Sequence, residues 1–170
     1  DVCSSDLQRI DIAQFYVYSQ PNSSLEEVIE ALTQAGKRGV KIRFLVDKKG
    51  MGMSNPETIA KIKAIPNLEF RVMDFAKIHN GIIHAKYIVV DQKTAFVGSQ
   101  NFDWRALTHI HETGLRIDDA ATVKQIDDIF ALDWQNQQRI ENHQALIQIQ
   151  QHAELQQPLS GHYLLASPAS

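Results

Sequence analysis

Two short segments in the middle of the chain decide how the rest of it is interpreted. They read His84-Ala85-Lys86-Tyr87-Ile88-Val89-Val90-Asp91 and, after six further residues, Gly98-Ser99-Gln100-Asn101. Apolar, β-branched runs of this length are typical of buried strands. We therefore predict strands over residues 83–90 and 94–99. An imidazole, an amine, a carboxylate, a hydroxyl and an amide accompany these strands.

The spacing in the first segment places His84 and Lys86 together. Side chains two residues apart on a strand share one face, so these two point the same way. They make a poor core pair but suit a phosphate, because the lysine offsets anionic charge and a neutral imidazole can attack phosphorus. Asp91 has the opposite parity at the strand end, which favours a hydrogen-bonding or turn role over contact with the phosphate.

The second segment and a later carboxylate extend this set. Ser99 and Asn101 are also two residues apart, and Gly98 lets the backbone turn closely under a ligand. Their hydroxyl and amide groups can donate hydrogen bonds to phosphate oxygens without adding charge. Glu112 follows on the next segment. A carboxylate bonded to the second ring nitrogen of His84 would fix its tautomer and stabilise its cation.

The fold class follows from the segments on either side. Further strands are predicted over residues 10–18, 42–46, 68–72 and 111–117. A helix from residue 25 has capping-box candidates before it and a stop at Gly36. A short helix begins at Asn55-Pro56, a loop precedes it over residues 48–55, and a third helix covers residues 120–134. This alternation predicts an α/β domain with a mixed, largely parallel β-sheet flanked by helices.

Composition narrows the class of protein without naming a substrate. The chain has 170 residues, 44% hydrophobic and 22% charged, with a formal net charge of -3. No global basic field draws it to nucleic acid, which gives weak support to lipid or small substrates. Cys3 is the single cysteine, so a disulfide framework and a cysteine-ligated zinc site are excluded. No apolar run approaches the ~20 residues of a membrane span.

Both ends of the chain suggest a piece of a longer protein. Residues 1–9 are interpreted as a non-native or disordered leader, and residues 10–134 as the domain. The glutamine-rich residues 135–158 are interpreted as a polar helix or linker, and residues 159–170 as the start of a truncated second half. The compartment stays unknown, with cytoplasmic, periplasmic and membrane-associated locations all open.

The pattern His84-x-Lys86-x4-Asp91-x6-Gly98-Ser99-x-Asn101 resembles the HKD motif of the phospholipase D superfamily. The chain is most similar to the first HKD half of a two-motif bacterial member, with a phospholipase D-like fold. By this resemblance the catalytic set is His84, Lys86, Asp91 and Glu112. His84 is the nucleophile or its general-acid counterpart, Lys86 and Asn101 bind phosphate, Ser99 assists, and Glu112 orients the histidine. Arg105 is expected to help bind phosphate.

The resemblance also implies a missing partner. Superfamily sites use two HKD motifs, and no second His-x-Lys occurs in this chain. The second half is expected in the same longer chain or, less favoured, in a homodimer. No cofactor and no metal are expected, and His109 and His111 are interpreted as solvated or rim residues rather than metal ligands.

The preferred function is a phosphodiesterase of phospholipase D type that hydrolyses or transfers phosphatidyl groups through a phosphohistidine. Phospholipid is then the substrate. One alternative is a nuclease, since Asp103-Trp104-Arg105 resembles superfamily members that act on nucleic acid. The other is a catalytically incomplete half that binds phosphate or lipid.

Overall fold

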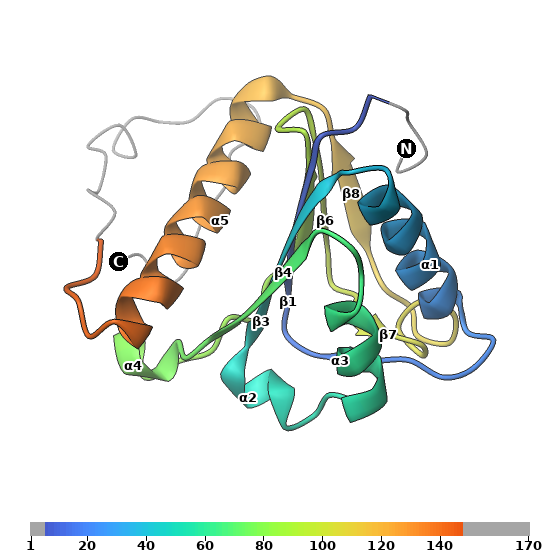
Figure 1. Cartoon of the computed structure of the whole chain (residues 1–170), viewed down its shortest axis with the longest axis horizontal. Helices are drawn as coiled ribbons and strands as arrows, with labels where there is room; N and C mark the ends of the chain where they lie inside the picture. Colours follow the sequence, from blue (N-terminus) through green and yellow to red (C-terminus); the bar gives the residue numbers. More distant parts are fainter. Residues whose placement is uncertain (1–5, 148–170) are drawn as a thin grey trace.

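Six strands form one mixed sheet with helices on both faces (Figure 1). The computed structural model describes residues 6–147, apart from the side chains of Ile78 and His79. The strand order is β4-β3-β1-β5-β6-β8, and β2 and β7 form a separate two-stranded sheet. The strands are β1 (Arg9–Gln14), β2 (Val17–Tyr18), β3 (Lys41–Asp47), β4 (Leu68–Met73), β5 (Lys86–Val90), β6 (Thr94–Gly98), β7 (Phe102–Asp103) and β8 (Gly114–Ile117). The helices are α1 (Ser24–Lys37), α2 (Lys48–Met51), α3 (Pro56–Lys63), α4 (Ala76–His79) and α5 (Ala120–Glu141).

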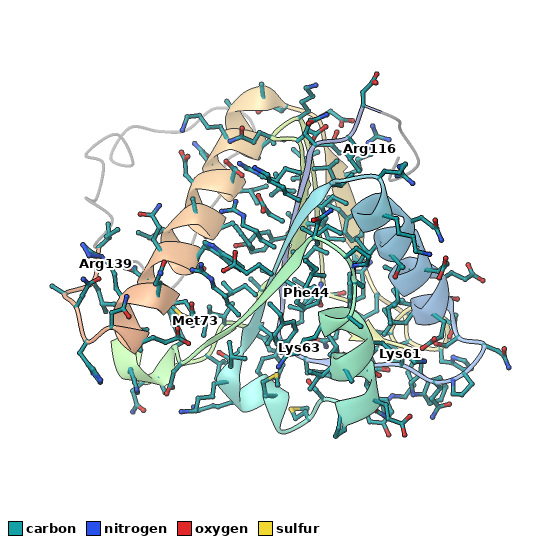
Figure 2. The ribbon with its side chains drawn as sticks, in the orientation of Figure 1. Phe44, Lys61, Lys63, Met73, Arg116 and Arg139 are labelled. Atoms are coloured by element: carbon teal, nitrogen blue, oxygen red, sulfur yellow. The ribbon has the colours of Figure 1, made fainter. Side chains whose placement is uncertain are left out.

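Alternation along the strands builds two hydrophobic layers, one on each face of the sheet. On β3, Phe44 packs toward α1 and α3, whereas Leu45 packs toward α5. Figure 2 shows Phe44 and Met73 on these two opposite sides. The period of two in strands thus supplies both layers from one central sheet, as expected for strands covered on both faces.

The sheet is mixed, as predicted: β1, β3, β4 and β6 run in one direction, and β5 and β8 run in the other. Strand β3 pairs in parallel with β1 and β4, whereas the pairings β1–β5, β5–β6 and β6–β8 are antiparallel. A tight turn joins β5 to β6 and makes this pairing antiparallel. Asp91 and Gln92 both have positive φ, at 50° and 57°, and Lys93 N donates to Val90 O at 3.0 Å. Such a turn returns the chain antiparallel to itself.

Several boundaries differ from the sequence-based expectation. The segment 10–18 is split between β1 and β2, and the expected loop 48–55 contains α2. Helix α1 does not stop at Gly36. Its last residue is Lys37, the left-handed residue is Gly39 at φ 95°, and a Cβ on Gly36 would lie 2.0 Å from Pro66 O. Gly36 is therefore required by close packing rather than by helix termination.

The C-terminal helix is longer than predicted. Helix α5 continues past Trp134 to Glu141, into the segment expected to be a polar helix or linker. Asn136 is buried there and exchanges two hydrogen bonds of 2.9 Å with the backbone of Ile147. The remainder of that segment and residues 159–170 lie outside the described residues, as do residues 1–5 of the expected leader. Among residues 6–147, no helix is long and apolar enough to cross a membrane.

Candidate active site

The predicted phosphate-binding residues gather at one end of the large sheet. Lys86 opens β5 and pairs with Gly98 at the end of β6, which in turn pairs with Gly114 at the start of β8. Because Tyr87 pairs with Ala13, Lys86 lies toward the C-terminal end of β1, where β3 also ends. Figure 1 shows α2 and β7 at this same end. The carboxyl ends of parallel strands are a common place for ligands to bind in α/β sheets.

His84 and Lys86 contact each other, as their spacing predicts. The Nζ atom of Lys86 donates toward the imidazole and lies 2.9 Å from Nδ1 and 3.1 Å from Nε2 of His84. His84 lies just before β5 rather than within it, so the predicted strand start at residue 83 is wrong. The imidazole is exposed, whereas Lys86 is only 5% exposed. In this pair the imidazole of His84 is accessible to solvent and the ammonium of Lys86 is buried.

The buried ammonium of Lys86 has no carboxylate partner. Within residues 6–147, no Asp or Glu oxygen lies within ion-pair distance of its Nζ atom. Burial lowers the pKa of Lys86, and the charge of Glu112 only partly opposes this. Buried charges in proteins are normally paired. The positive charge of Lys86 is therefore not balanced by a carboxylate of the described residues.

The surroundings of His84 favour its neutral form. Burial lowers the pKa of His84, the charge of Lys86 lowers it further, and Asp47 partly opposes both. The ring centroid of Phe15 lies 4.9 Å from that of His84, and Lys86 Nζ lies 5.9 Å from the Phe15 centroid. A neutral imidazole keeps a free lone pair on one nitrogen, which nucleophilic attack requires.

Two residues that support His84 were missed by the sequence analysis. Phe15 is a buried apolar residue, 8% exposed, whose ring also contacts the imidazole of His84. Asp47 accepts a hydrogen bond of 2.8 Å from Ile83 N, and its other oxygen caps α2 at Lys49 N, also at 2.8 Å. A Cβ on Gly50 would lie 1.6 Å from Phe15 O, so α2 is packed directly against this support.

Ser99 and Glu112 form a second pair. The Ser99 hydroxyl donates to Glu112 and accepts a hydrogen bond of 3.0 Å from Thr113 N. In the described part of the chain no hydrogen bond joins Glu112 to His84, and the electrostatic effect of Glu112 is on Lys86. Orientation of His84 by Glu112 thus stays a prediction, and the contact that is present is with Ser99.

The amide groups of this site have unused hydrogen-bonding capacity. Asn101 Oδ1 and Gln100 Oε1 are buried without a partner in the described residues. The Gln100 side chain lies against the glycine pair, because a Cβ on Gly98 would be 2.1 Å from Gln100 Oε1 and one on Gly114 would be 3.1 Å from Gln100 Nε2. Both atoms are hydrogen-bond acceptors, so their free capacity suits a donor group and not the oxygens of a phosphate.

Asp91 follows the end of β5 that is farther from His84, and the five residues of that strand alone span about 17 Å. Its carboxylate accepts hydrogen bonds from Gln8 N at 2.9 Å and Arg9 N at 2.7 Å. Its placement among the catalytic residues is therefore not supported by the geometry. Asp91 has the structural role that its parity indicated, joining the β5–β6 turn to the start of β1.

Arg105 is held by a different carboxylate. Its guanidinium makes two hydrogen bonds to Asp103, of 3.1 and 2.7 Å, and Tyr16 donates to the same carboxylate at 2.8 Å. Burial raises the pKa of Asp103, but these hydrogen bonds outweigh it and the net pKa is lowered. The side chain of Arg105 is half-exposed. Its contact with phosphate stays a prediction.

The described residues contain no group of three His, Cys, Asp or Glu side chains arranged to hold a metal ion. The ring of His109 packs against Trp104.

Comparison with known proteins agrees with this arrangement. The family described as "Cardiolipin synthase, PLD-like domain" matches residues 4–134. The 5′-3′ exonuclease PLD3 of Rattus norvegicus is 34% identical over 115 residues, covering 62% of this chain and 23% of PLD3. The virion nicking-joining enzyme of Monkeypox virus is 28% identical over 137 residues, covering 76% of this chain and 31% of the enzyme. The chain thus spans about a quarter to a third of these relatives' length.

The fold is shared with solved structures. NucT from Helicobacter pylori superposes with a TM-score of 0.64 at 22% identity, covering 75% of this chain and 79% of NucT. At 22% identity, this similarity supports a shared fold only. The family match, in contrast, covers the strands that carry both halves of the motif. Because it spans most of the chain, the protein belongs to the phospholipase D superfamily.

Proposed function

We propose that this chain supplies one half of the active site of a nuclease, with His84 and Lys86 at the phosphodiester. The observation that carries the proposal is the buried Lys86 ammonium, which has no carboxylate partner among residues 6–147 and lies against an imidazole whose pKa is lowered. A phosphodiester anion would supply the missing negative charge. The same anion would bring its phosphorus next to the lone pair of His84.

The other residues of the site fit an anion in the same place. Ser99 and Asn101 follow the end of β6 that pairs with Lys86, and the NH2 group of the Asn101 amide would donate to a phosphate oxygen. Neutral donors add hydrogen bonds to phosphate oxygens without excess positive charge, and they act most strongly where water is excluded. The Ser99 hydroxyl donates to Glu112, so it would donate to a phosphate oxygen only by giving up that hydrogen bond.

The chemistry is a two-step substitution at phosphorus. One nitrogen of neutral His84 forms a bond to phosphorus while the bond to the leaving oxygen breaks, and that oxygen takes a proton from a second histidine. Water, deprotonated by the second histidine, then displaces His84. Lys86 offsets the charge that builds up on the oxygens during both steps. The roles of the two histidines are exchanged if His84 is the acid.

This chain has one HKD motif, so the second histidine must belong to another one. The sequence has a single His-x-Lys, so a second HKD half in a longer chain, or a second copy of this chain, would complete the site. The imidazole of His84 is exposed, and so is Leu115 on the edge strand β8, at 63%. A partner could therefore approach the sheet from this end.

Nucleic acid is the better-supported substrate class. Relatives of this chain are named as a 5′-3′ exonuclease and as a virion nicking-joining enzyme. This support outweighs the phosphatidyl substrate preferred from the sequence. Phosphatidyl transfer remains a second candidate because the matching family is described by cardiolipin synthase.

The two substrates can be compared directly in a protein that contains this chain together with a second HKD half. We expect cleavage of a single-stranded oligonucleotide with a higher kcat/KM than hydrolysis of phosphatidylcholine in vesicles. A denaturing gel and a choline-release assay would measure the two rates. Hydrolysis of phosphatidylcholine without cleavage of DNA or RNA oligonucleotides would overturn the nuclease proposal.

A further inference from the structure

Trp104 lies outside both hydrophobic layers of the protein. The second tryptophan, Trp134, is 6% exposed and stacks on Phe130 with ring centroids 5.6 Å apart. Trp104 is only partly buried and belongs to neither cluster of packed apolar side chains in residues 6–147. An indole is among the largest apolar groups a protein can bury, so one left outside the core needs another explanation.

The Trp104 ring contacts a histidine and an arginine. The ring of His109 meets it edge-on with centroids 5.2 Å apart, and the guanidinium carbon of Arg105 lies 5.8 Å from its ring centroid. The side chain of Arg105 is 50% exposed and His109 is exposed. We refer to Trp104, Arg105 and His109 as the aromatic–cationic cluster.

The cluster is held rigidly. Asp103, fully buried, fixes the Arg105 guanidinium with two hydrogen bonds and accepts a third, of 2.7 Å, from Arg105 N. Trp104 N donates to Tyr18 O at 2.9 Å, and Thr108 Oγ1 donates to Trp104 O at 2.7 Å. These bonds tie the cluster to the β2–β7 sheet, so its side chains need little further ordering to receive a ligand.

A series of contacts connects the cluster to the His84–Lys86 site. Trp104 is three residues after Asn101, and Tyr16, which bonds to Asp103, follows Phe15 directly in the chain. Phe15 lies under His84, and its ring meets that of Tyr16 edge-on at 6.0 Å. A nucleic-acid strand bound by one phosphate at Lys86 would therefore extend toward the cluster along these contacts.

We propose that Trp104 and Arg105 form a subsite for the nucleotide next to the scissile phosphodiester, with its base stacked on the indole. Bases stack readily on aromatic rings and on guanidinium groups, whatever their identity. The inference rests on the proposed nuclease function and adds to it that the bound base must be unpaired.

The proposal is tested by tryptophan fluorescence in a Trp134→Phe variant of the 170-residue chain, where Trp104 is the remaining indole. His84→Asn in the same chain prevents cleavage during the titration. We expect an oligothymidylate to quench Trp104, and an abasic oligonucleotide of equal length to bind without quenching. In anisotropy titrations, Trp104→Ala should weaken oligothymidylate binding about tenfold and leave abasic binding unchanged. Met53→Ala, at an exposed apolar residue between α2 and α3, should change neither.

The outcomes separate this subsite from the nuclease function itself. Absence of quenching, or equal weakening of both oligonucleotides by Trp104→Ala, overturns the subsite. If the longer protein cleaves oligonucleotides while Trp104→Ala has no effect on their KM, the subsite fails and the nuclease proposal stands. If Trp104 is quenched by oligothymidylate alone but the longer protein cleaves no nucleic acid, the nuclease proposal fails and the base-binding surface remains.

Discussion

Replacing His84 with asparagine in a protein that holds both HKD halves is expected to lower phosphodiester turnover by at least about a thousandfold. Asparagine keeps a polar group at the position but has no lone pair basic enough to attack phosphorus and no proton to give at neutral pH. The loss is expected whether His84 attacks or protonates. Initial rates on an oligonucleotide, followed on a denaturing gel, would measure it.

The matched control for this variant is His143→Asn. His143 is an exposed histidine after α5 with φ 53°, a conformation that asparagine tolerates well. Its turnover should equal that of the unaltered protein. Because His84 is also exposed, His84→Asn should leave the folded state intact, which far-UV circular dichroism checks. Retention of more than about a tenth of the original turnover by His84→Asn would contradict the role given to this residue.

Replacing Lys86 with methionine is expected to change activity and stability in opposite directions. Turnover should fall about 100- to 1,000-fold, as when one preorganised donor to a developing oxyanion is removed. The free energy of unfolding should rise by about 1–3 kcal/mol, because a buried cation that has no carboxylate partner in the described part of the chain gives way to an apolar side chain of similar volume. For a chain of this size, each kcal/mol is about 2–4 °C in Tm.

Kinetics of the two-half protein and thermal unfolding of the 170-residue chain measure these two effects. Lys124→Met removes an exposed lysine from α5, whose side chain is 73% exposed, and should change neither quantity. A Lys86→Met variant that is both inactive and less stable would show that Lys86 serves packing rather than phosphate binding.

The parts of the site that follow local rules were predictable. Two residues of spacing put His84 and Lys86 in contact, and the opposite parity put Asp91 in a structural role. The apolar runs that became β3 and β5 were recognisable from β-branched residues alone. These features depend on a few neighbouring residues, which the sequence displays directly.

The parts that were missed depend on contacts between distant segments. Asp47 supports His84 by accepting from Ile83 N, 36 residues away in the chain. Phe15 is apolar and lies in an apolar run, so nothing local shows that this buried side chain also contacts the imidazole. The Ser99–Glu112 contact depends on the pairing of β6 with β8. The Arg105 guanidinium is bonded to Asp103, and the spacing of residues in the sequence does not reveal this bond.

The central claim is that His84 and Lys86 form a phosphate site, and an NMR pH titration of the His84 ring in the 170-residue chain tests it most directly. In the free chain the pKa of His84 should lie below its ordinary value of 6.5, because burial and the charge of Lys86 both lower it. Inorganic phosphate should raise that pKa, since an anion beside the ring favours its cation, and Lys86→Met should remove this response. A His84 that titrates at its ordinary value and ignores phosphate would contradict the claim.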